Sequence, residues 1–106
     1  MLLNDAYSPI PLNLGRTTIT PGALVALGGD RTEVSRLLRP ILDRFARRDW
    51  GEVTAHDAAA NLGDLGVDGR VVATYTVARV RLLVIREVST EVTEGVLTTV
   101  LLPEEY

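Results

Sequence analysis

The segment from Arg47 to Asn61 holds the side chains of this chain that are best equipped for chemistry. It contains the only tryptophan, Trp50, and the only histidine, His56, with carboxylates and arginines around them. An imidazole that meets a carboxylate can act as a general base, whereas an indole flanked by charged groups is typical of a protein-binding surface. The segment therefore predicts either a catalytic pair or a docking surface.

A catalytic pair finds less support than a docking surface. His56 and Asp57 are neighbours, so on a helix they point in different directions and do not face each other. The serines lie in no G-x-S-x-G turn, and no glycine cluster matches a phosphate-binding or dinucleotide-binding loop. We predict that the protein is not an enzyme and has no catalytic residues. A small hydrolase that pairs His56 with a carboxylate from elsewhere is the second alternative.

Cysteine and lysine are both absent from the 106 residues. Without cysteine the chain forms no disulfide and offers a zinc ion only His56 and carboxylates, so we expect no metal and no cofactor. Without lysine it has no Schiff-base chemistry. A chain of this length is one domain, and 46% hydrophobic with 24% charged residues is typical of a globular protein.

The formal net charge of −3 gives no general attraction to nucleic acids or anionic membranes. All eleven basic residues are nevertheless arginines, and six of them fall between Arg31 and Arg48. Arginines on one helix face can contact phosphates, so nucleic-acid binding by the helix face over residues 36–48 is the first alternative function. No apolar run reaches about 18 residues and no signal peptide is visible, so we expect a cytoplasmic protein without membrane contact.

Apolar residues at helical spacing predict the longest helix. Its apolar face is formed by Val34, Leu37, Leu38, Ile41, Leu42 and Phe45. Asp30 or Thr32 should cap its N-terminus, and Pro40 should kink it or divide it in two. A second helix should follow the capping residue Thr54 and run to about Leu62.

Segments rich in valine and threonine predict the strands. They cover residues 15–20, 70–77, 80–88 and 96–102. Thr20 and Pro21 should start a short helix directly after the first strand. Residues 80–88 are apolar on both faces, so this strand should be central and a homodimer is expected. We predict an α+β fold, with helices packed on one face of a small antiparallel sheet of three or four strands and an extended arm at residues 1–14.

Three blocks of sequence resemble a family of small bacterial proteins, often encoded on plasmids or phages, that are known as plasmid-related proteins. The blocks are residues 14–24, residues 48–53 with 57–61, and residues 98–106. The family differs from this chain in having glycine where Arg48 stands and a tryptophan in the region of residues 82–90. The resemblance implies the α+β plan and a mobile-element setting, and it implies no reaction.

The junction between the two longer helices is the predicted binding site. Trp50 should either close the corner between the two helices as a core or rim residue, or present its indole outward as a docking surface for a protein partner, with charged groups around it. The predicted site depends on the outward arrangement. The predicted binding residues are Arg44, Arg47, Arg48, Asp49, Trp50, Glu52, His56, Asp57 and Asn61. We expect a small non-catalytic protein-binding protein of a mobile element, as an accessory or an inhibitor of a host defence system.

Overall fold

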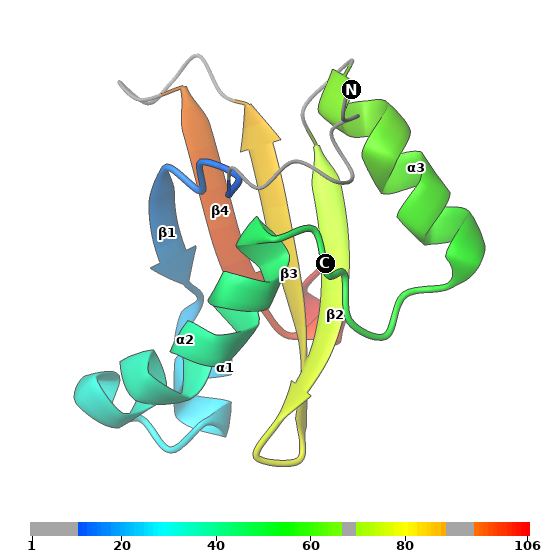
Figure 1. The fold of residues 1–106 in the computed structure, drawn as a ribbon. Helices are drawn as coiled ribbons and strands as arrows, with labels where there is room; N and C mark the ends of the chain where they lie inside the picture. The colour runs from blue at the N-terminus through cyan, green and yellow to red at the C-terminus, as the bar shows by residue number, and fades with distance from the viewer. Residues whose placement is uncertain (1–10, 67–69, 89–94) are drawn as a thin grey trace.

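A four-stranded sheet in the order β1-β4-β3-β2 forms the centre of the computed structural model, which describes residues 11–66, 70–88 and 95–106 (Figure 1). The α+β class predicted from the sequence is confirmed. Residues 1–10 of the predicted arm lie outside the described residues. Along the chain the elements are β1 (Arg16–Ile19), α1 (Pro21–Ala26), α2 (Arg31–Ala46), α3 (Ala55–Gly66), β2 (Val71–Val77), β3 (Val80–Val88), β4 (Val96–Leu101) and η2 (Pro103–Glu105).

The last three strands pair antiparallel in chain order, as the predicted antiparallel sheet requires. β2 and β3 form a hairpin in which Val77 lies opposite Val80. Ala78 and Arg79 make the turn, with φ angles of 49° and 66°. Two successive left-handed residues give a turn whose twist matches that of the strands, although asparagine and glycine are the usual residues there.

The expectation of a purely antiparallel sheet is wrong at one pair. β1 lies parallel to β4, with Ile19 opposite Val100. Parallel neighbours need a long connection, and here the three α-helices and two other strands lie between them in the chain. The apolar pattern of a strand carries no information on its direction, so this pairing is decided by the tertiary fold.

α2 crosses one face of the sheet and buries the apolar stripe predicted for it (Figure 1). The Asp30 carboxylate caps the helix by accepting hydrogen bonds from the N–H groups of Thr32 and Glu33, at 2.9 and 3.1 Å. Pro40 lies inside the helix, which continues through it, so of the predicted kink or division the division is wrong. The buried residues of α2 are Val34, Leu38, Ile41 and Phe45.

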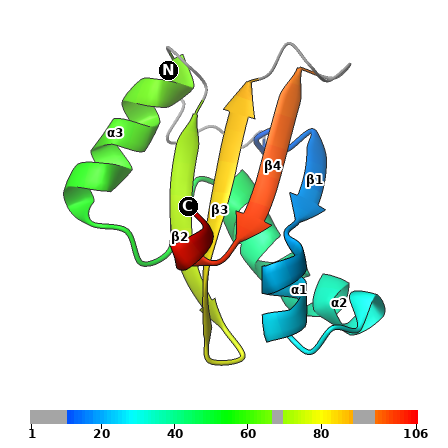
Figure 2. The same ribbon diagram turned by 180° about the vertical axis from the view of Figure 1, so that it is seen from behind.

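α3 does not share the face that α2 covers, which corrects the expectation of helices on one face only. It stands beside β2 at the edge of the sheet (Figures 1 and 2). There it borders a cavity of about 390 Å³ on the side of the sheet that Val72, Thr74 and Leu83 share. The first turns of α3 carry alanines in place of large apolar side chains, so the helix has no broad stripe to lay across the sheet.

The core lies between α2 and the sheet. α1 follows β1 directly, with Thr20 as the predicted N-cap, and adds Ala23 and Leu27 to this core. In the described part of the chain, no helix has the length and apolar character needed to cross a membrane. The buried residues that the sheet contributes to the core are Val71, Ala73, Tyr75, Leu82, Val84 and Val100.

Candidate functional site

The helix–helix junction begins with a tightly hydrogen-bonded end of α2. The N–H of Arg48 donates to the carbonyl of Phe45 at 3.0 Å, and the N–H of Asp49 donates to the carbonyl of Arg44 at 2.9 Å. This pair of bonds is the Schellman motif, whose C′ residue adopts the left-handed conformation. Arg48 occupies that position with a φ of 67°. Glycine is favoured there because it has no Cβ, so an arginine at this position holds a strained backbone conformation.

Trp50 is buried, with 6% of its surface exposed, so the expectation that its indole faces outward is wrong. Its ring meets Phe45 edge to face, with the centroids 5.4 Å apart and an interplanar angle of 71°. Such edge-to-face pairs are favoured by the charge distribution of aromatic rings. The indole closes the corner between α2 and the sheet, and this packing accounts for a tryptophan there.

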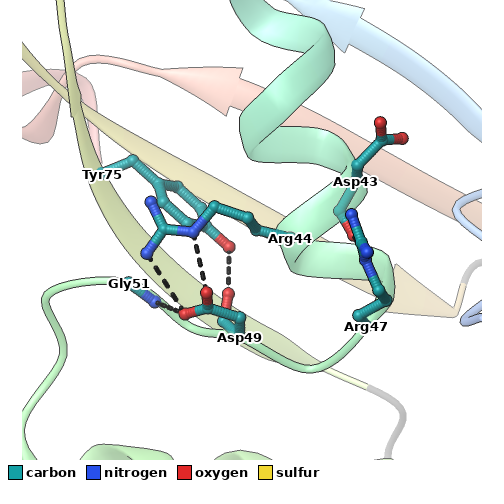
Figure 3. A network of polar contacts seen from close by, with 6 residues as sticks. All are labelled: Asp43, Arg44, Arg47, Asp49, Gly51 and Tyr75. Carbon is teal, nitrogen blue, oxygen red and sulfur yellow. Dashed lines mark hydrogen bonds and ion pairs between the residues drawn. The ribbon is translucent and has the colours of Figure 1, made fainter.

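Arg44 and Asp49 form a bidentate ion pair beside Tyr75 (Figure 3). Nε and Nη2 of Arg44 donate to the carboxylate at 2.8 and 3.3 Å, and the guanidinium lies 5.1 Å from the Tyr75 ring centroid. The Tyr75 hydroxyl donates to the Asp49 carbonyl at 2.5 Å. The hydrogen bond from Arg44 lowers the pKa of Asp49, and burial raises the pKa of Tyr75. These groups bind one another and fix the loop that carries Trp50.

The main chain from Trp50 to Glu52 pairs with the outer edge of β2. Thr74 donates its N–H to the Trp50 carbonyl at 3.2 Å and accepts from the Glu52 N–H at 2.7 Å. Gly51 adopts a φ of 71°, and a Cβ there would lie 2.1 Å from the Thr74 carbonyl oxygen. The loop approaches β2 so closely that only glycine fits at this position.

Side chains complete the cover of this edge. Asn61 is 5% exposed and hydrogen-bonds both the N–H and the carbonyl of Val72. Glu52 accepts a hydrogen bond from the Thr76 hydroxyl at 2.7 Å. A bare sheet edge is a template for unwanted pairing, and proteins cover it or blunt it. Three residues of the predicted binding site therefore stabilise the fold by covering the outer edge of β2: Trp50, Glu52 and Asn61.

Three further predicted residues lie on the surface: Arg47, His56 and Asp57. His56 and Asp57 are exposed in the first turn of α3, and His56 has no ion pair within the described ranges. The N–H of Asp57 donates to the Thr54 hydroxyl at 3.1 Å, which confirms Thr54 as the cap. Arg47 is exposed, and its Nε donates to the Asp43 carbonyl at 3.3 Å. Across residues 11–66, 70–88 and 95–106 no three potential metal ligands come together.

The opposite edge of the sheet, β1, is uncovered: within the described residues no strand lies beyond it. A groove runs between β1 and α2, with one part of about 410 Å³ and another of about 440 Å³ that share a lining. We call this the β1–α2 groove. The lining residues common to both parts are Thr17, Thr18, Ile19, Ser35 and Leu38.

The β1–α2 groove has an apolar floor and a charged rim. Val34, Leu38 and Leu42 of α2 form part of the floor, while Arg31 and Arg39 stand at the rim. The sequence prediction missed this site because it followed the chemically rare residues, tryptophan and histidine. The available signal was the position of Arg31 and Arg39 beside the apolar stripe of the longest helix.

Comparison of the chain with protein-family profiles, with curated proteins and with solved structures found no match. The assignment of a site therefore depends on the geometry of this chain. That geometry offers one sheet edge that the chain itself covers and one beside a groove that the described residues leave open.

Proposed function

We propose that this chain is a small protein-binding module that takes an extended segment of a partner as an added strand along β1. The observation that carries the proposal is the contrast between the two sheet edges. Trp50, Glu52 and the Asn61 amide hydrogen-bond the outer edge of β2, whereas within the described residues β1 ends the sheet on the other side. In strand addition, main-chain hydrogen bonds supply affinity and neighbouring pockets supply specificity.

The direction of the β1 backbone supports an added strand. The Thr20 N–H donates to the Val100 carbonyl at 3.0 Å, toward β4. Because backbone groups alternate in direction along a strand, those of Thr18 also point toward β4, and those of Thr17 and Ile19 point outward. Two outward residues offer about four hydrogen bonds, each contributing about 1 kcal/mol net.

The groove supplies the second element, a place for the partner's side chains. Thr17 and Ile19 share the face of the sheet that α2 covers, as their register with Thr98 and Val100 shows. A strand paired to β1 directs every second side chain to that same face, into the groove. Burial of one branched apolar side chain there adds about 2 kcal/mol. Together these contributions amount to about 6 kcal/mol, which corresponds to a transient complex with a dissociation constant of roughly tens of micromolar.

A display library of random ten-residue peptides, selected on the immobilised protein, tests the proposal. Thr17→Pro removes the outward N–H at an edge position where proline is tolerated, and Thr17→Val retains that N–H while losing the hydroxyl. We expect enriched peptides to bind the wild type and Thr17→Val, and to lose at least about tenfold in affinity for Thr17→Pro. Equal binding to all three proteins would refute strand addition at β1.

Placement of the protein on a mobile element, as an accessory or an inhibitor of a host defence system, is supported by the resemblance of the three sequence blocks alone. The geometry of α2 gives less support to the first alternative function, the binding of nucleic-acid phosphates by its arginines. Arg36 pairs with Glu33 at 2.9 Å and Arg44 pairs with Asp49, so two of its cations already face carboxylates. Protein binding therefore stays the proposal.

A further inference from the structure

We propose that the segment bound along β1 is acidic: two carboxylate side chains four residues apart flank an apolar residue and meet Arg31 and Arg39 of α2. The inference rests on the proposed function, strand addition at β1, and adds the chemistry of the partner. The apolar residue between the two carboxylates enters the groove beside Leu38 and Ile19, which line both of its parts.

The spacing of the two arginines fits an extended segment. They are eight residues apart on one helix, and at about 1.5 Å per residue their Cα atoms are separated by about 12 Å along its axis. Residues four apart in a strand lie on one face and are separated by about 13 Å. The middle residue of such a trio lies on the same face, so all three side chains reach the groove together.

The charges of the groove favour acidic residues. Arg31 and Arg39 line it, and within the described residues neither has an ion pair. Asp43, at one end, is the one carboxylate among the lining residues, so the rim is positive although the chain carries −3. Complementary charges select a partner and raise its association rate.

A second copy of this chain fits the groove less well than a foreign segment does. Antiparallel pairing of β1 with its own copy would bring Thr17 and Ile19 of the copy to the face that α2 covers, and neither side chain is acidic. Acidic residues four apart occur in this sequence only as Asp64 with Asp68 and Glu87 with Glu91. The middle residues of those trios are Gly66 and Ser89, and neither supplies an apolar side chain.

Fluorescence anisotropy with two labelled ten-residue peptides tests the inference. One peptide contains Glu-Thr-Ile-Thr-Glu at its centre and the other Lys-Thr-Ile-Thr-Lys, within the same uncharged flanks. We expect the acidic peptide to bind at least about tenfold more tightly at low salt, with the preference shrinking as salt screens the charges. Arg31→Glu/Arg39→Glu should reverse the preference, so that the basic peptide binds the variant more tightly than the acidic one.

The matched control is Arg36→Glu/Arg47→Glu, which changes the net charge equally on α2 and its C-cap but away from the groove lining. It should keep the preference for the acidic peptide. Equal binding of both peptides, with both lost in Thr17→Pro, would overturn the acidic preference and leave strand addition standing. Binding of neither peptide, with no peptide recovered from the display library, would remove the proposed function as well. A wild-type dimer that Thr17→Pro converts to a monomer would make the occupant a second copy and overturn the inference.

Discussion

The Asn61 carboxamide hydrogen-bonds Val72 as a neighbouring strand would, because Nδ2 donates to the carbonyl at 2.8 Å and Oδ1 accepts from the N–H at 3.1 Å. One side chain thus takes the place of a β-ladder residue and holds α3 against the edge of the sheet. The relationship explains why a polar residue is buried in an alanine-rich helix, and it makes the stability of the edge measurable.

Asn61→Leu should destabilise the protein by about 2 kcal/mol, because both Val72 backbone groups lose their partner at a half-buried position. Urea unfolding followed by circular dichroism measures the change. Ala59→Gln alters an exposed position of the same helix and should stay within about 0.5 kcal/mol of wild type. A wild-type-like midpoint for Asn61→Leu would show that the edge does not depend on this amide.

Gly51→Ala should destabilise by at least about 2 kcal/mol, because its positive φ is strained for alanine and its Cβ would meet the Thr74 carbonyl. The matched control is Gly63→Ala, where a Cβ would meet nothing within 4 Å inside α3. That change should stabilise the protein by roughly 0.5–1 kcal/mol. Thermal and urea unfolding of both variants should therefore shift in opposite directions, and shifts of the same sign would contradict this account.

Arg48→Gly should be more stable than Arg48→Ala by about 1 kcal/mol, because both lose the side chain and only glycine relieves the left-handed backbone. The control pair is made at Arg47, whose φ is −91°. There alanine should equal or exceed glycine in stability. The urea midpoints of the four variants measure these differences. A more stable alanine variant than glycine variant at position 48 would contradict the left-handed helix end described above.

Acidic pH should destabilise the helix–helix junction, because it protonates the Asp49 carboxylate. Its pKa is lowered in the folded protein, chiefly by the hydrogen bond from Arg44. A carboxyl with a lowered folded pKa stabilises above its unfolded pKa of about 3.9, and this stabilisation is lost as pH falls through the folded pKa. We expect Asp49→Asn to be less stable than wild type at pH 7, and the two proteins to have similar stability near pH 2. Urea unfolding at both pH values measures the difference. Because the Arg44–Asp49 pair is half exposed, the difference in free energy of unfolding between wild type and variant should be small. It should shrink further in 1 M salt. A gap that widens at low pH would show that the carboxylate does not stabilise the fold.

Local sequence patterns predict most of the secondary structure. The spacing of Val34, Leu38, Ile41 and Phe45 marks the buried face of α2, and the alternation around Leu82 and Val84 marks a central strand. Caps at Thr20 and Thr54 were also predictable, since a hydroxyl that accepts from a backbone N–H three residues on depends on neighbours in sequence.

Helix continuity through Pro40 and the direction of β1 were not predictable in the same way. Packing of the apolar stripe on the sheet holds α2 together across the proline, and this stabilisation comes from residues far away in the sequence. The parallel pairing of β1 with β4 depends on where the intervening helices place the chain.

The α+β class, the helix caps and the set of apolar residues available for a core are readable from the chain, because they follow from spacing and from contacts within a few residues. Which side chains are free to meet a partner depends on contacts between segments far apart in the sequence. Trp50 and Asn61 look like binding residues in isolation, but folding uses them to close a corner and cover β2. β1, a short threonine-rich strand with little individual signal, becomes the open edge because nothing in the described fold pairs beyond it.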